Sequence, residues 1–287
     1  MTAFATVPAR AVDVRWEAHG GQFMPVALAV ARRNLLSIRR APSVFVSSLM
    51  FPIMSIITMS GAYSGVALVP GFPANSMAAW MLGFTVVQAS AMVGMSSGLG
   101  LIRDIETKFY DRLLLAPINR GSLIGGLYLA VSARVVVPFA ITLGLAMATG
   151  ARFYSNPVLG ILCVFVAAEG SALLGAGYGI GMGLRLRTFA AAPIMFMTVF
   201  VVMFLSPVQV PLGYISGWLH HIAVANPITR VTSLARAGLT HDVKIGDVVV
   251  GHGGITTRTL AEAVGVLVPS IILLAWFAVR GMRKLDN

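Results

Sequence analysis

Few residues of this chain combine a reactive side chain with a place where chemistry could occur. Two charged residues, Arg134 and Glu169, fall inside long apolar stretches. A charge in a membrane interior normally pairs, faces the inside of a helix bundle, or lines a path for a substrate or for protons. Counted along their helices at about 1.5 Å per residue, the two differ in depth by about 5–8 Å, which an arginine side chain spans. The sequence therefore predicts an Arg134–Glu169 ion pair, a transport path, or separate partners.

The remaining reactive side chains do not form a recognisable catalytic or metal site. Four of the five histidines lie in the polar region 211–259, but no spacing among them matches a zinc motif. The single cysteine, Cys163, lies in an apolar stretch, so it can form no intrachain disulfide. We therefore expect neither a metal ion nor a catalytic residue on this chain.

Glycines recur at four-residue spacing in the apolar stretches. The run 175–183 is preceded by no strand pattern and followed by no Lys-Ser or Lys-Thr, so it is not a nucleotide-binding loop. Small residues four apart favour close approach of membrane helices instead. We expect this packing at Gly175, Gly179 and Gly183, and at the pairs Gly61/Gly65 and Gly94/Gly98.

Composition and span length show which elements must carry these residues. Of 287 residues, 57% are hydrophobic and 11% charged, well below the roughly 25% charged of an ordinary soluble domain. A bilayer core about 30 Å thick needs about 20 apolar residues per helix. Six segments reach that length: 44–69, 76–102, 122–148, 158–184, 189–210 and 260–279.

The basic residues predict the orientation of these spans. With the N-terminus inside, 15 of the 21 lysines and arginines fall on the cytoplasmic side and five outside. Four of those five lie in the long segment 211–259, which counts little toward orientation. Both termini are therefore expected in the cytoplasm. The net charge of +11 then requires no nucleic acid, because it faces anionic lipid headgroups.

Two short segments outside the spans have amphipathic helical patterns. Residues 26–40 are expected to lie on the inner leaflet, with Leu28, Ala31 and Leu35 on one face and Arg33 opposite, unless they form a solvated linker. In the charged insert 103–120, Ile102, Ile105, Phe109 and Leu113 share a face, while Asp104 and Lys108 form a favourable i,i+4 pair. This second helix can lie on lipid or dock on a protein, and its mixture of aromatic, branched and charged residues favours a protein.

A third helix is expected in the segment between spans five and six. Asn226 is a good N-cap, Pro227 suits the first helical position, and Gly238 can end the helix. Its apolar face should rest on the bundle: Ile228, Val231, Leu234 and Ala235.

These motifs carry a resemblance to a known family. Pro211, Trp218-Leu219, Asn226-Pro227-Ile228-Thr229 and Arg236, in this order between spans five and six, resemble the signature of the ABC-2 type permeases, in particular the daunorubicin-resistance-type drug exporters. The insert, which runs into residues 114–120, resembles the first cytoplasmic loop of that family. The likeness covers nearly the whole chain, although 240–259 makes the outer segment longer than the family pattern.

The resemblance implies an all-α integral membrane protein with six transmembrane helices, an N-terminal amphipathic interfacial helix, a cytoplasmic coupling helix and outer half-helices. Residues 1–43 would form the cytoplasmic tail and interfacial helix, 44–279 the transmembrane domain, and 280–287 a cytoplasmic tail. The coupling helix, at 104–115, would sit in a cleft of a separate ATPase. Its contact residues would be Asp104, Ile105, Glu106, Phe109, Tyr110, Leu113 and Leu114. The extracellular gate signature would comprise Trp218, Asn226, Pro227 and Arg236.

The implied function is that of a permease subunit of an ATP-driven exporter in the bacterial plasma membrane, moving a hydrophobic or amphipathic drug, antibiotic or lipid. Two permeases, identical or related, would work with two ATP-binding subunits, which would hold the ATP and magnesium. This chain would therefore be no enzyme and need no cofactor. Two alternatives stay open: a proton-coupled antiporter, for which Glu169 is the one intramembrane carboxylate, and an exporter of glycans.

Overall fold

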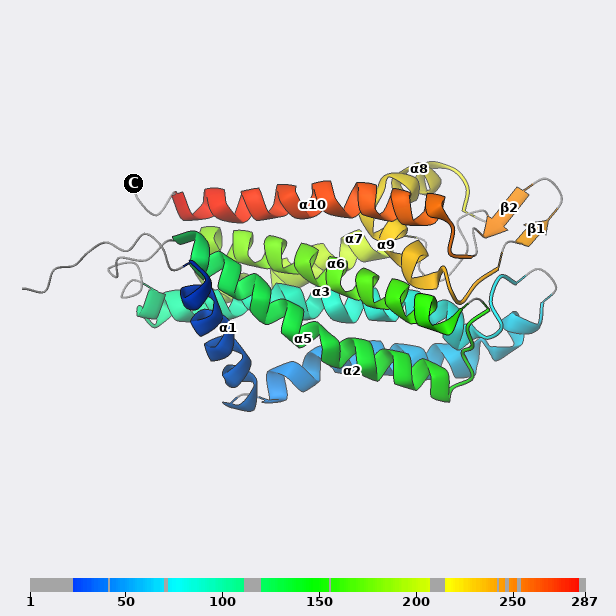
Figure 1. Cartoon of the computed structure of the whole chain (residues 1–287), viewed down its shortest axis with the longest axis horizontal. Coiled ribbons are helices and arrows are strands. Elements are labelled where there is room, and N and C mark those ends of the chain that lie inside the picture. Colours follow the sequence, from blue (N-terminus) through cyan, green and yellow to red (C-terminus); the bar gives the residue numbers. More distant parts are fainter. Residues whose placement is uncertain are drawn as a thin grey trace, which may run out of the picture.

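The structure, a computed structural model, describes residues 23–40, 42–69, 72–110, 120–154, 156–206, 215–241, 243–245, 248–251 and 254–283. These residues form a long, predominantly helical bundle (Figure 1). The helices in chain order are α1 (Phe23–Arg40), α2 (Pro42–Ala62), η1 (Ser64–Leu68), α3 (Met77–Glu106), α5 (Arg120–Ala148), α6 (Pro157–Leu186), η2 (Phe189–Ala191), α7 (Ala192–Phe204), α8 (Trp218–Ala225), α9 (Pro227–Arg236) and α10 (Thr257–Arg283). The expected all-α membrane fold is confirmed in its main features.

Four of the six expected spans are present as helices long and apolar enough to cross a membrane. They are α3, α5, α6 and α10. Figure 1 shows them side by side along the long axis, with α5 running in the opposite direction to α3, α6 and α10. We call the end that holds α1 the α1 end, and the opposite end the hairpin end.

The first expected span, 44–69, is shorter in the structure. Helix α2 ends at Ala62, and a separate 3-10 helix, η1, occupies Ser64–Leu68. At about 1.5 Å per residue, the 21 residues of α2 still reach about 30 Å, the thickness of a bilayer core. This helix can therefore cross a membrane without the residues that follow it.

The fifth expected span, 189–210, is also shorter. Helix α7 has 13 residues and ends at Phe204, about 20 Å at 1.5 Å per residue, which is less than a full span. Pro207 lies just beyond this end, and proline is common after a helix C-cap because it cannot continue the helix. Two short helices, α8 and α9, follow later in the chain, in the segment where outer half-helices are expected.

The centre of the bundle is α3, which packs on α6 through glycine. The most apolar stretch of α3 is completely buried. A Cβ atom placed on Gly98 would lie 2.0 Å from the carbonyl oxygen of Gly179, and one on Gly175 would lie 2.2 Å from that of Ala91. The predicted close packing is therefore confirmed for this helix pair, with backbone against backbone. It is not found at Gly61 and Gly65, where no atom of the described residues lies within 4 Å of such a Cβ.

Helix α10 covers the outer side of α6. Leu267, Leu274 and Phe277 fill the spaces above Gly170, Gly177 and Gly181. At the α1 end, Arg185 stacks on the Phe277 ring, with its guanidinium carbon 3.5 Å from the centroid. Only 17% of the most apolar stretch of α10 is buried, so most of this helix has an apolar outward face suited to lipid.

Helix α1 lies across the α1 end of the bundle, roughly perpendicular to the long helices (Figure 1). The predicted amphipathic helix at 26–40 is thus present, with a start at Phe23. Within residues 23–36, whose burial is described, the buried residues are Ala27 and Ala31, whereas Leu28, expected on the same face as Ala31, is exposed. The buried side packs on α5, where a Cβ on Gly126 would lie 2.6 Å from the Ala27 carbonyl oxygen. The face of α1 that packs on α5 therefore consists of small residues, because small residues allow two helices to approach closely.

The segment expected to be unusual, 240–259, holds two short strands. Strand β1 (Val243–Ile245) pairs antiparallel with β2 (Val248–Gly251). This hairpin projects from the bundle at the hairpin end (Figure 1). The sequence left the structure of this segment open, and two strands of three and four residues leave the all-α class unchanged.

Candidate functional site

The charged insert does not form one helix at 104–115 in the described residues. Helix α3 continues without a break through Asp104, Ile105 and Glu106, and Thr107 is its C-cap. Lys108 has a φ of 55°, a left-handed conformation that interrupts the helical register. Phe109 and Tyr110 are helical again. Residues 111–119, which include Leu113 and Leu114, lie outside the described residues.

Asp104 binds α1 and not Lys108. Arg33 donates to both carboxylate oxygens of Asp104, at 2.7 and 2.6 Å, the two-pronged geometry that makes arginine–carboxylate pairs specific. The hydrogen bonds to Asp104 raise the pKa of Arg33 above its ordinary value. The guanidinium also lies over the Phe109 ring, 4.0 Å from its centroid. The expected Asp104–Lys108 pair is therefore replaced, because the turn at Lys108 removes the helical spacing on which it depended.

Several residues expected to face a partner also contact their own chain. Tyr110 is buried, and Ile105 packs on the hydrophobic core. Phe109 and Tyr110 line a cavity of about 300 Å³ between α1, the end of α3 and α5. Glu106 is exposed, and its Oε1 accepts a hydrogen bond from the backbone N–H of Phe189 at 2.8 Å. The end of α3 is thus bound to two other elements, α1 and η2.

In the described residues, the two intramembrane charges form no ion pair with each other. Arg134 donates a short hydrogen bond to the carbonyl oxygen of Asn34 on α1, so this arginine holds the amphipathic helix on α5. Among the described residues, no ion pair joins Arg134 to Glu169, and the buried Oε2 of Glu169 receives no hydrogen bond. Of the alternatives that the sequence left open, the contacts of Arg134 fit a partner other than Glu169. The acceptor is a backbone carbonyl of α1, the helix that crosses α5. The depths of the two charges along their own helices could not predict this partner.

The predicted helix at the hairpin end is present as α9. The Asn226 side chain accepts from Ile228 N–H at 2.9 Å and donates to the Val202 carbonyl at 2.7 Å, so it both caps α9 and ties it to α7. Pro227 occupies the first turn, and the helix ends at Arg236, two residues before Gly238. The expected apolar face is buried: Ile228, Val231, Leu234 and Ala235. Trp218, at the start of α8, is 70% exposed.

Arg236 is almost completely buried against the first turns of α3. Its side chain passes over Gly83, where a Cβ would lie 2.5 Å from the arginine Cγ. Its Nε donates to the Trp80 carbonyl at 2.9 Å, and its guanidinium carbon lies 3.7 Å from the Trp80 ring centroid. Loss of hydration lowers the pKa of Arg236 to about 9, so at neutral pH it stays charged and able to stack on the indole.

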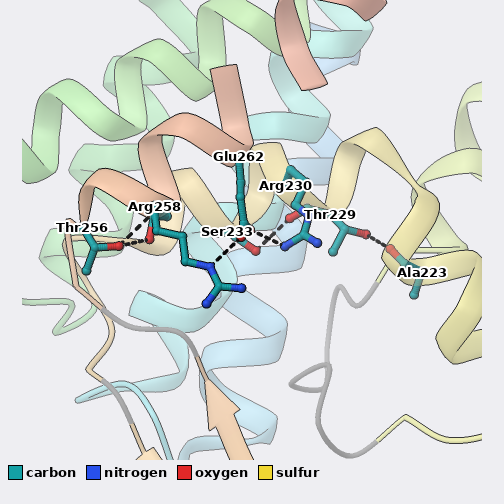
Figure 2. Close-up of polar contacts among 8 residues, drawn as sticks. Ala223, Thr229, Arg230, Ser233, Thr256, Arg258 and Glu262 are labelled. Atoms are coloured by element: carbon teal, nitrogen blue, oxygen red, sulfur yellow. Dashed lines mark hydrogen bonds and ion pairs between the residues drawn. The ribbon is translucent and has the colours of Figure 1, made fainter. Parts of the chain in front are cut away.

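A charged cluster at the hairpin end was not foreseen. Glu262 of α10 accepts from Arg230 of α9 at 2.6 Å and from Arg258 at 2.8 Å (Figure 2). Arg258 and Glu262 have the i,i+4 spacing of a helical ion pair, which the sequence could have indicated. The link to Arg230, 32 residues earlier, depends on the packing of α9 against α10.

Figure 2 also shows the hydroxyl contacts beside this cluster. The Thr229 hydroxyl donates to the Ala223 carbonyl at 2.6 Å, and the Ser233 hydroxyl donates to the Thr229 carbonyl at 2.9 Å. Thr229 also contacts the hydroxyl of Ser206, at the end of α7, at 3.1 Å. Hydrogen bonds therefore join helices α7, α8 and α9 to one another.

The histidines in the described residues have ordinary partners. A His220 ring nitrogen lies 3.1 Å from the Ile215 carbonyl oxygen, and the His241 ring lies against Tyr154, with 4.8 Å between centroids. Across the described ranges, no group of three His, Cys, Asp or Glu side chains is placed to hold a metal ion. His252 lies outside these ranges.

An open apolar cavity of about 220 Å³ lies between α3, α6, α7, α9 and α10. Its lining includes Leu174, Tyr178, Val199 and Ile228, which come from three of these helices. Such a lining suits a hydrophobic group rather than a charged one.

Long apolar helices around a buried centre, with an amphipathic helix across one end, define a polytopic α-helical membrane protein. The chain belongs to the ABC-2 type transporter family, whose model it matches over residues 26–240. That range begins in α1 and ends just beyond α9. No curated protein matches the chain. Membership in this family makes it a membrane component of an ABC transporter, and it implies partnership with ABC ATP-binding subunits.

Proposed function

We propose that this chain is the permease subunit of an exporter for a hydrophobic or amphipathic substrate, a drug or a lipid, driven by ATP hydrolysis on a separate subunit. The observation that carries the proposal is the match to the ABC-2 type transporter family over residues 26–240. Two permeases, identical or related, would work with two ATP-binding subunits in a bacterial plasma membrane. The chain itself would perform no covalent chemistry.

The α1 end is the proposed cytoplasmic end. The arginine and lysine asymmetry supports this orientation. In Figure 1, α1, the end of α3 and the C-terminal end of α10 lie together at this end of the bundle. The ATPase would bind here, at the segment that begins with Asp104. Exposed Arg103, Glu106 and Lys108 give that surface the mixed charge that suits a protein partner.

The hairpin end is the proposed outer gate. Helices α8 and α9 are tied to α7 by Asn226 and Thr229, and α9 is tied to α3 and α10 by Arg236 and Arg230. Displacement of α7 would therefore move the short helices with it. The apolar cavity beside α7 supports a hydrophobic or amphipathic cargo over a glycan, since a glycan needs many hydrogen-bonding partners.

The test is reconstitution of the permease with its ATPase in proteoliposomes. The probes are daunorubicin and a phospholipid that carries a fluorescent headgroup. We expect movement of at least one probe that needs ATP and stops with a catalytically inactive ATPase. Movement driven by an imposed proton gradient without ATP would contradict the proposal and favour an antiporter.

A mutational test addresses the docking site. Replacing Phe109 and Leu113 with alanine should reduce co-purification of the ATPase at least tenfold, because a small interface depends on a few apolar anchors. The permease should still insert, since its spans are unchanged. Unchanged ATPase binding and transport by this variant would place the docking site elsewhere.

A further inference from the structure

A basic surface lies where α6 and α10 end, at the α1 end of the bundle. Residues 180–190 and 270–285 contain four arginines and one lysine, and no aspartate or glutamate. Two of these arginines lie close together in the structure, Arg185 of α6 and Arg280 of α10, and their positive charges repel each other. An anion bound between them would replace this repulsion with attraction to both charges.

The Arg185 guanidinium is held in place against α10. Its Nη1 donates to the Gly181 carbonyl at 2.7 Å, and its Nη2 donates to the Phe277 carbonyl at 3.1 Å. A Cβ atom on Gly281 would lie 3.2 Å from Nη1, so the charge sits beside the residue that follows Arg280. A guanidinium has five N–H groups, of which these two hydrogen bonds to described residues use two. The remaining N–H groups are available to a further acceptor.

Arg280 is exposed and stacks on a tryptophan of its own helix. Its guanidinium carbon lies 4.3 Å from the ring centroid of Trp276, one helical turn earlier. In the part of the chain that the structure describes, no carboxylate forms an ion pair with Arg280 or with Arg185. Stacking uses the face of a guanidinium and leaves its N–H groups free to donate. The two arginines therefore offer several donors to one ligand with several acceptor oxygens, such as a phosphate group.

An exposed apolar stripe of α10 leads up to this basic surface. Val268, Ile272 and Trp276 are exposed and four residues apart, so they share one helical face with Arg280; we call these three residues the α10 stripe. From Val268 to Arg280 the helix measures about 18 Å, close to the roughly 15 Å of hydrocarbon in one leaflet of a bilayer. Tryptophan beside the charged end is typical of the membrane–water interface. The α10 stripe with its arginine thus matches a phospholipid in length and polarity.

We infer that Arg185 and Arg280 bind the phosphate of one anionic phospholipid of the inner leaflet, whose acyl chains lie along the α10 stripe. The inference goes beyond the proposed function and takes from it only the orientation, with the α1 end in the cytoplasm. A zwitterionic lipid fits this site less well, because its headgroup brings a positive charge close to the two arginines. General attraction of a basic protein to an anionic surface is shared by all its basic residues, whereas this site depends on two.

The experiment uses the full-length permease in phosphatidylcholine vesicles and the fluorescence of Trp276. Increasing fractions of the lipid are replaced by phosphatidylglycerol, or in a parallel titration by phosphatidylcholine, with bromine on the acyl chains. Bromine quenches tryptophan on contact, and Trp276 lies about 6 Å from Arg280 along the helix, so quenching reports lipid bound there. Trp16→Phe and Trp218→Phe form the background, while Trp80 stays because it is buried. Each signal is divided by that of the same variant in unbrominated lipid.

We expect half-maximal quenching at a phosphatidylglycerol fraction about tenfold lower than the phosphatidylcholine fraction. Arg280→Gln and Arg185→Gln should each reduce this preference about fivefold, the contribution of one basic residue near anionic headgroups. Arg280→Lys should keep most of it, because the charge remains. Arg187→Gln is the matched control, since Arg187 is exposed at the same end, and its preference should stay within about twofold of the parent. Arg280 is exposed, so its variants test the site even where Arg185→Gln disturbs packing.

Equal quenching by the two lipids in the parent protein would overturn the inference. So would an undiminished preference in Arg280→Gln, because the attraction would then belong to the basic surface as a whole. Weak quenching by both lipids, the result expected where a second copy or another protein covers the α10 stripe, would overturn it as well. No ATP-binding subunit enters the measurement, so each of these results leaves the proposed function standing.

Discussion

Arg236 and Trp80 lie stacked in the interior of the hairpin end, with the guanidinium carbon 3.7 Å from the indole ring centroid and Nε 2.9 Å from the Trp80 carbonyl oxygen. One residue of α9 thereby binds both the ring and the backbone of the first turns of α3. Gly83 supplies the space through which the arginine side chain passes. The short helix α9 is anchored to the central helix of the bundle by this contact.

The Arg236 contact predicts a loss of stability on truncation. Arg236→Ala should lower the free energy of unfolding by about 2–4 kcal/mol, because it leaves a cavity beside Trp80 and removes the stacked cation. Thermal unfolding in detergent measures the effect. Arg152→Ala, at an exposed arginine of the same end, is the control and should change little. Equal melting temperatures for both variants would show that the stack contributes no stability.

The α3–α6 glycine contact predicts a difference between two glycines of one helix. Gly98→Ala should destabilise by about 1–3 kcal/mol, since its Cβ would lie 2.0 Å from the Gly179 carbonyl oxygen and must push the helices apart. Gly100→Ala, where no described atom lies within 4 Å of the added Cβ, should be neutral or stabilise by up to about 1 kcal/mol through helix propensity. Unfolding in a denaturing detergent compares them, and similar effects at both positions would rule out backbone contact as the cause.

Arg134 and Glu169 are expected to behave independently. Because Arg134 binds the Asn34 carbonyl, Arg134→Leu should loosen α1, whereas Glu169→Gln should act within α6. The double variant Arg134→Leu with Glu169→Gln should therefore show additive changes in unfolding free energy, within about 0.5 kcal/mol. A double-mutant cycle measures this sum. A coupling energy of about 1 kcal/mol or more would show that Arg134 and Glu169 interact, as in the ion pair that the sequence suggested.

The cluster around Glu262 predicts a small, salt-dependent effect. Arg230 and Glu262 are about one-third exposed, at 30% and 35%, so Glu262→Gln should cost about 1 kcal/mol or less, and less still at high salt. The Arg258 side chain is 80% exposed, so Arg258→Ala should leave the free energy of unfolding almost unchanged. Unfolding at low and high ionic strength tests both. A Glu262→Gln effect that does not change with salt would point to packing instead of charge.

The proposed orientation predicts which surface residues a reagent outside the cell can reach. In a Cys163→Ser background, a cysteine at Lys108 should be shielded from an impermeant maleimide added to intact cells, because the α1 end faces the cytoplasm. A cysteine at Lys244, in the β hairpin, should be labelled. Permeabilised cells provide the control, in which both positions should react. Labelling at position 108 in intact cells would reverse the topology.

The sequence by itself determined the features that depend on neighbours along one helix. Apolar length and low charge indicated a multi-span bundle, and Asn226 and Pro227 indicated the start of α9. Four-residue glycine spacing indicated that helices approach closely, without showing which two helices meet. Each signal lies within a few residues, because caps and helix faces are set by local periodicity. The same local reasoning placed the ends of the first and fifth spans too far along the chain, beyond Ala62 and Phe204. Apolar composition alone does not show where one helix ends and the next short helix begins.

Only the tertiary structure decided which polar groups meet. Asp104 binds Arg33 from 71 residues away, and Arg134 binds the Asn34 carbonyl from 100 residues away, although the sequence suggested nearer or charged partners for both. The tertiary structure also places Ile105 and Tyr110 against the hydrophobic core. Around Gly61 and Gly65 it places no described atom close enough for helix packing. The physical reason is that a buried or half-buried charge takes whichever partner the packing of helices brings within about 3 Å. That packing is set by the whole bundle and not by the spacing of residues on one helix.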